Sequence, residues 1–111
     1  MEQSRIDHFV ILQSTVKDKE IFCLPAYDTS TGQLYMLKIY DLSNPDTIAM
    51  KIDSFKNEVQ VYQNLSHPNL VTYFKSKPDA IWFGQDAKQT QVAYLVLEYV
   101  RGGQLFDYTN I

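Results

Sequence analysis

Two charged residues of this 111-residue sequence occupy positions where charge is unusual, and their chemistry is the first clue to a function. Lys38 interrupts the apolar run 34–40, and Glu58 lies beside the apolar stripe of a segment with helical periodicity. A lone ammonium in an otherwise apolar strand and a carboxylate beside a buried stripe are the first candidates for residues that do chemistry. The alternative is a lysine at a solvated strand edge and an ordinary acid on a helix surface.

The strands that must position this pair are predicted from runs of apolar and β-branched residues. These runs predict strands at about 9–13, 20–27, 33–41, 70–75 and 92–100. Alternation within 33–41 places Met36, Lys38 and Tyr40 on one face of the strand and Leu37 and Ile39 on the other. The preceding turn, 28–32, ends in a glycine that can adopt a positive φ.

A helix is predicted at about 45–65, after the capping residue Asn44 and a proline suited to the first turn. It ends before His67 and Pro68. Its buried stripe comprises Ile48, Ile52, Phe55, Val59 and Tyr62. A polar loop with exposed aromatic residues is predicted around Trp82, and a short helix start at 104–108. Together these elements predict one α+β domain over residues 1–111, a five-stranded antiparallel sheet with one main helix packed on it.

The composition argues against several classes of function. Ten Lys and Arg against thirteen Asp and Glu give a net charge of −3, so no basic excess attracts nucleic acid or an anionic membrane. Cys23 is the only cysteine and there are two histidines, so neither an internal disulfide nor a metal cluster is expected. Without a signal-peptide pattern or a membrane-spanning apolar run, a cytoplasmic protein is expected.

Four motifs in the same order resemble those of the N-terminal lobe of the protein kinases. Residues 35–39, Y-M-L-K-I, resemble the V-A-I-K strand, and Glu58 resembles the glutamate of helix C. Residues 65–71, L-S-H-P-N-L-V, resemble the L-x-H-P-N-I-V turn, and residues 94–108 resemble the fifth strand, the hinge and the start of helix D. The hinge segment is most similar to serine/threonine kinases of the calcium/calmodulin-dependent type.

The resemblance implies a role for each matching residue. Lys38 would hold the α- and β-phosphates of ATP and pair with Glu58. Backbone groups of Glu98 and Val100 would meet the adenine ring, with Met36 and Leu97 lining that site. The sequence contains neither the H-R-D-x-x-x-x-N catalytic loop nor the D-F-G metal site. We therefore expect no cofactor and no metal for this chain alone, and ATP with Mg²⁺ only if a C-terminal lobe completes the site.

The chain departs from the kinase pattern in three ways. Residues 1–31 contain no glycine, so the glycine-rich loop is degenerate, and Glu20 adds negative charge where the triphosphate would lie. Met36 replaces the small alanine that packs on adenine in the family. Tyr62 and Tyr73 take the N-lobe positions of the hydrophobic column that links the two lobes, and their hydroxyls would need partners if buried.

A lobe without its partner lobe would expose an apolar underside, which usually marks an interface. We expect a protein partner on the surface that would face a C-terminal lobe, where Leu97 and Tyr99 also lie. The expected interface residues are Tyr62, Tyr73, Trp82, Phe83, Leu105 and Phe106. The alternatives are that the residues 105–106 pack back on the last strand and that the aromatic residues 82–83 fill their own loop.

Two functions are therefore considered. The favoured one is a truncated, pseudokinase-like lobe that lacks the catalytic loop, is inactive alone and binds a protein partner. The other is the N-terminal fragment of an ATP-binding serine/threonine protein kinase, which transfers phosphate only when a C-terminal lobe is supplied.

Overall fold

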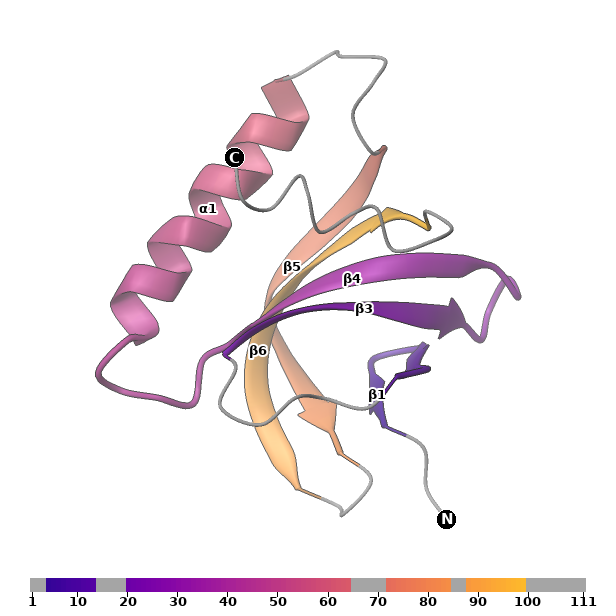
Figure 1. The fold of residues 1–111 in the computed structure, drawn as a ribbon, viewed down its shortest axis with the longest axis horizontal. Coiled ribbons are helices and arrows are strands. Elements are labelled where there is room, and N and C mark those ends of the chain that lie inside the picture. Colours follow the sequence, from indigo (N-terminus) through magenta and orange to yellow (C-terminus); the bar gives the residue numbers. More distant parts are fainter. Residues whose placement is uncertain (1–3, 14–19, 65–71, 85–87, 100–111) are drawn as a thin grey trace.

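The computed structural model describes residues 4–13, 20–64, 72–84 and 88–99 of the chain. These residues form β1 (Arg5–Ile6), β2 (Phe9–Ile11), β3 (Ile21–Asp28), β4 (Leu34–Asp41), α1 (Ile48–Asn64), β5 (Tyr73–Phe83) and β6 (Gln89–Glu98). The strands close into an antiparallel barrel in the order β1-β2-β3-β4-β6-β5. The single helix of the described residues packs outside this barrel, along β4, β5 and β6 (Figure 1).

The predicted α+β class is confirmed, but the predicted number of five strands is wrong, because the sheet has six strands and is closed as a barrel. The additional strand is β1, which pairs with β2 on one side and with the end of β5 on the other, where Ile6 lies opposite Trp82. This second pairing closes the six-stranded barrel. Two residues are too few to show an alternating pattern, so the sequence carries no signal for this strand.

The predicted strand 70–75 and the loop around Trp82 are also corrected, because β5 runs without interruption through Tyr73–Phe83. Its register with β6 shifts between Tyr73 and Lys75 and again between Lys77 and Ala80. Such irregularities add unpaired residues and change which face a side chain occupies, so period-two alternation is lost along the strand. Pro78, which lacks an N–H donor, lies within the second irregularity.

The central strands agree with the prediction to within a few residues. β3 and β6 match the predicted ranges 20–27 and 92–100, and the predicted first strand, 9–13, is β2. Gly32 in the turn before β4 has a φ of 78°, which an L side chain adopts only with strain. β4 is paired on both sides, with β3 and with β6, so it is a central strand.

The helix begins later than predicted, at Ile48 instead of residue 45. The segment before it forms a turn in which the N–H of Asp46 donates to the side-chain oxygen of Asn44 at 2.9 Å. The predicted apolar stripe is confirmed, since Phe55 is buried and the other four members pack around it against the sheet. The predicted end near residue 65 and the helix start at 104–108 lie outside the described residues.

Two apolar clusters lie on opposite faces of β4 and β6. The barrel-interior cluster comprises Ile6, Phe9, Ile11, Phe22, Leu24, Ala26, Leu37, Ile39, Ala80, Trp82, Val92, Tyr94 and Val96. The helix-facing cluster comprises Met36, Tyr40, Leu42, Phe55, Ala93, Leu95 and Leu97. Because side chains alternate along a strand, the face that carries Met36 and Tyr40 is the face that meets α1.

Within the described ranges, no helix has both the length and the apolar character needed to cross a membrane. These ranges also hold no group of three or more His, Cys, Asp or Glu side chains placed to bind a metal ion.

Candidate functional site

The predicted ion pair between β4 and α1 is present. Nζ of Lys38 lies 2.5 Å from Oε1 of Glu58, and the side chains are 7% and 22% exposed, respectively. Both charges are therefore largely removed from water and are compensated by each other. The pair places a fixed ammonium on the helix-facing side of the barrel.

Local structure explains why these two side chains meet. Lys38 lies opposite Cys23 of β3 and Leu95 of β6, so the alternative of a solvated edge lysine is wrong. Glu58 follows Phe55 by three residues on α1, so it lies on the side of the helix that faces the sheet. The alternative of an ordinary surface acid is wrong for the same reason.

Tyr40 completes this site and was not singled out by the sequence analysis. Its hydroxyl lies 3.2 Å from Oε1 and 3.3 Å from Oε2 of Glu58, and Nζ of Lys38 lies 5.6 Å from the centroid of its ring. Burial, together with the nearby carboxylate, raises the pKa of the Tyr40 hydroxyl, so this group remains a hydrogen-bond donor. The sequence feature that could have identified Tyr40 is its position two residues after Lys38, on the same face of the strand.

Cys23 lies next to the ion pair, opposite Lys38 in the β3–β4 ladder. Burial raises the pKa of its thiol to about 11, against an ordinary value of 9.0. The group is therefore a neutral thiol at physiological pH.

A second ion pair, which the sequence analysis missed, joins the start of α1 to the sheet. Lys51 is 3% exposed, and its Nζ donates to Oε1 of Glu20 and, at 2.6 Å, to the backbone oxygen of Asp41. Thr47 donates to the same carboxylate at 2.9 Å. Glu20 was expected to add negative charge where a triphosphate would lie. That expectation is corrected, because Lys51 neutralises the carboxylate, and the donors lower its pKa.

The residues predicted to line an adenine site divide into two groups. Met36 and Leu97 lie opposite each other in the β4–β6 ladder and are 4% and 0% exposed, so they are side by side in the helix-facing cluster. The N–H of Glu98 donates to the backbone oxygen of Thr72 at 2.8 Å, so this donor is already engaged. Val100 lies outside the described residues.

The predicted interface residues are only partly brought together. The rings of Tyr62 and Tyr73 stack with centroids 5.9 Å apart, and the hydroxyl of Tyr73 donates to Ser76 at 2.9 Å. Both rings are partly exposed at one side of the helix-facing cluster. Burial raises the pKa of Tyr62 to about 12.

The expectation that Trp82 is an exposed anchor is wrong. Its side chain lies inside the barrel, where Nε1 donates to Oγ of Ser4 at 2.6 Å, and only its neighbour Phe83 is exposed. Leu97 is likewise buried and cannot belong to an exposed underside. Leu105 and Phe106 lie outside the described residues.

Comparison with known proteins places this geometry in context, although no protein-family profile matches the chain. The chain is 38% identical to the calcium/calmodulin-dependent protein kinase type 1 of Caenorhabditis briggsae over 79 residues, which are 71% of this chain and 18% of that kinase. It is 37% identical to CBL-interacting protein kinase 21 of Oryza sativa subsp. japonica over 74% of this chain and 14% of that protein.

A third relative, serine/threonine-protein kinase GL21140 of Drosophila persimilis, is 33% identical over 91% of this chain and 12% of its own length. Among solved structures, Rad53 1–466 in complex with AMP-PNP matches with a TM-score of 0.57 and 24% identity. That match covers 93% of this chain and 24% of the Rad53 chain. The chain thus spans less than a fifth of the length of these three curated relatives.

Proposed function

This chain resembles serine/threonine protein kinases in sequence and has the fold of their N-terminal lobe, and we propose that it acts as the nucleotide-facing lobe of a kinase-like domain. In this proposal Lys38 binds the phosphates of ATP, and Glu58 holds Lys38 in place. A segment outside these 111 residues supplies the catalytic base and the Mg²⁺ ligands.

The observation that carries the proposal is the Lys38–Glu58 contact of 2.5 Å. In protein kinases, activity requires the strand lysine and the helix glutamate to be paired, because the lysine must be fixed where the phosphate charge arrives. Here the helix already lies in the position that allows this pairing, and the donor from Tyr40 supports the same carboxylate. The charge arrangement is therefore ready to accept a polyphosphate without a helix movement.

We propose that the 111 residues alone bind ATP weakly and transfer no phosphate. The sequence contains no H-R-D or D-F-G motif, which in kinases provide the base and the metal ligands. A few hydrogen bonds to adenine contribute about 1 kcal/mol each, whereas micromolar binding needs about 8 kcal/mol. Binding to one lobe should therefore fall short of the affinity of a two-lobe cleft.

A second candidate is a pseudokinase-like module that binds a protein partner instead of a nucleotide. Met36 favours it, because this side chain is larger than the alanine of the kinase pattern and lies at 4% exposure beside Leu97. The partly exposed, stacked pair Tyr62 and Tyr73 also favours it. The partner would cover the side of the lobe that faces a C-terminal lobe in kinases.

The first experiment measures the intact mass of the native protein, recovered from its own cells with an antibody against the exposed face of α1. A mass of about 30 kDa or more, the size of a two-lobe domain, supports the nucleotide-facing lobe. A mass near 12.9 kDa favours the interaction module.

The second experiment measures Mg·ATP binding to the native protein by calorimetry. The proposal expects Lys38→Met to weaken ATP binding about tenfold or more, which corresponds to the loss of about 1.4 kcal/mol. The matched control is Lys56→Met, since Lys56 is an exposed lysine on α1. An ATP affinity that Lys38→Met does not change rejects the nucleotide role. No ATP binding at millimolar concentration leaves the interaction module as the better explanation.

A further inference from the structure

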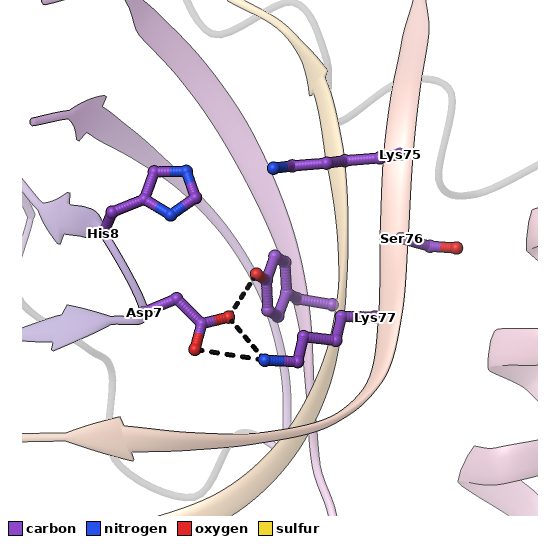
Figure 2. Close-up of a pocket in the computed structure, with 6 residues that line it drawn as sticks. Asp7, His8, Lys75, Ser76 and Lys77 are labelled. Carbon is purple, nitrogen blue, oxygen red and sulfur yellow. Dashed lines mark hydrogen bonds and ion pairs between the residues drawn. The ribbon is translucent and has the colours of Figure 1, made fainter. Parts of the chain in front are cut away.

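A second polar site lies on the opposite side of the sheet from α1. It is a pocket of about 480 Å³, lined by Asp7, His8, Lys75, Ser76, Lys77 and Tyr94. Lys75 and Lys77 lie opposite Val96 and Tyr94 in the β5–β6 ladder, on the barrel-interior face. Figure 2 shows both lysines and His8 directed toward one space, whereas Ser76 points away from it.

The one carboxylate among these lining residues is already neutralised. Asp7 lies in the β1–β2 turn with a φ of 53°, and its Oδ2 accepts a hydrogen bond from the hydroxyl of Tyr94 at 2.6 Å. Nζ of Lys77 lies 3.3 Å and 3.2 Å from its two oxygens. Burial acts to raise the pKa of the Asp7 carboxyl, but the hydrogen bonds from Tyr94 and Lys77 outweigh it and lower the pKa.

Lys75 is the lysine of the pocket that does not pair with Asp7. Its Nζ lies 5.5 Å from the centroid of the Phe9 ring, an arrangement that holds an ammonium by cation–π attraction and leaves its donors available. Within the described residues, no carboxylate lies within ion-pair distance of Lys75. His8 lies beside it, with Nε2 3.6 Å from Oδ2 of Asp28 and a side chain that is 36% exposed.

From this arrangement we propose that the pocket binds a phosphate monoester group, with Lys75 as the principal cation and His8 and Lys77 as additional donors. A phosphate monoester carries a charge of about −1.5 to −2 near pH 7 and has three acceptor oxygens. It can therefore contact several donors at once, whereas the smaller charge of a carboxylate is satisfied by Lys75 alone. The neutralised Asp7 leaves the Lys75 side of the pocket favourable for an anion.

This site goes beyond the proposed kinase function and does not depend on it. Lys38 lies on the face of β4 that meets α1, and Glu58 lies on the side of α1 that faces the sheet. The pocket lies on the other side of the sheet. Loss of ATP binding in a Lys38 variant would therefore leave the pocket intact, and failure of the pocket would leave the kinase proposal intact.

The experiment is a titration of the ¹⁵N-labelled chain with inorganic phosphate at constant ionic strength, followed by NMR. The expected result is a saturable shift of the amides of His8, Lys75 and Lys77. Lys75→Gln should weaken binding about fivefold or more, and Lys56→Gln, an exposed lysine on α1, should not change it. If Lys75→Gln perturbs folding, His8→Gln provides the second variant with the same expected direction.

Further arms identify the source of the phosphate. Tighter binding of a phosphoserine peptide than of inorganic phosphate supports a phosphorylated protein as the ligand, and tighter binding of AMP supports a nucleotide. Equal affinity for all three supports a site for the phosphate group alone. The proposal would be overturned by any of three results. These are shifts that do not saturate, a phosphate affinity that Lys75→Gln and His8→Gln both retain, and competition by acetate that equals competition by phosphate.

Discussion

The hydroxyl of Tyr40 lies 3.2 Å and 3.3 Å from the two carboxylate oxygens of Glu58. The same carboxylate also accepts a hydrogen bond from Lys38. Two residues on one face of β4 thus hold the same carboxylate of α1. Because Lys38 and Tyr40 are adjacent on that face, one strand determines both the charge balance of the site and the position of the helix.

The first prediction concerns the hydroxyl of Tyr40. Tyr40→Phe keeps the ring, which packs edge-on against Phe55 at 5.7 Å, and removes only the donor. We expect a loss of about 1–2 kcal/mol in the free energy of unfolding, because a hydrogen bond to a charged acceptor is removed. Urea denaturation measures this loss. Tyr35→Phe is the control, since in the described part of the chain its hydroxyl donates to the exposed side chain of Gln33. Equal effects of the two variants would contradict the prediction.

The second prediction separates the two members of the ion pair. Glu58→Gln leaves the ammonium of Lys38, at 7% exposure, without a counter-charge and should destabilise the chain by about 3 kcal/mol. Lys38→Met places an apolar chain of similar length in an apolar cluster, and Tyr40 still bonds to Glu58, so its cost should be smaller. Chemical denaturation of the single and double variants gives the coupling energy. A larger loss of unfolding free energy for Lys38→Met than for Glu58→Gln would contradict this prediction.

The third prediction concerns the contact between the start of α1 and the sheet. Lys51→Met removes the buried donor to Glu20 and to the backbone oxygen of Asp41. We expect a loss of about 2–3 kcal/mol in the free energy of unfolding, because two acceptors lose a charged donor. We also expect faster amide hydrogen exchange in the first turn of α1. Lys56→Met, on the exposed side of the same helix, should change neither quantity. Unchanged exchange in the Lys51 variant would show that this contact does not hold the helix.

The fourth prediction is that stability falls at alkaline pH. Burial raises the pKa of Cys23 from 9.0 to about 11 and that of Tyr62 from 10.0 to about 12. The folded state keeps protons that the unfolded chain releases first, so this stabilisation is complete below pH 9 and is lost as the pH rises toward 11–12. Denaturant midpoints measured between pH 8 and 11 should decrease. Cys23→Ala should make that decrease shallower, and an identical slope in the variant would contradict the assignment.

Local periodicity placed Lys38 and Glu58 at the buried faces of their elements, whereas their pairing was predicted from the resemblance to the protein kinase motifs. Alternation along 34–41 separates Lys38 and Tyr40 from Leu37 and Ile39, and the structure places these two sets against α1 and inside the barrel. Spacings of three and four on α1 likewise identify the side that packs on the sheet. Such patterns are reliable because burial of one face selects apolar residues at the repeat of the element itself.

What the sequence determined by itself was therefore the identity of β3, β4, β6 and α1 and the buried faces of β4 and α1. Tertiary structure alone decided the closure of the barrel by β1, the inward position of Trp82 and the Lys51–Glu20 contact. It also decided the pocket in which Asp7 meets Lys77, 70 positions away. These features depend on register shifts and on contacts between distant segments, and no repeat within a single element records which distant side chain will lie opposite it.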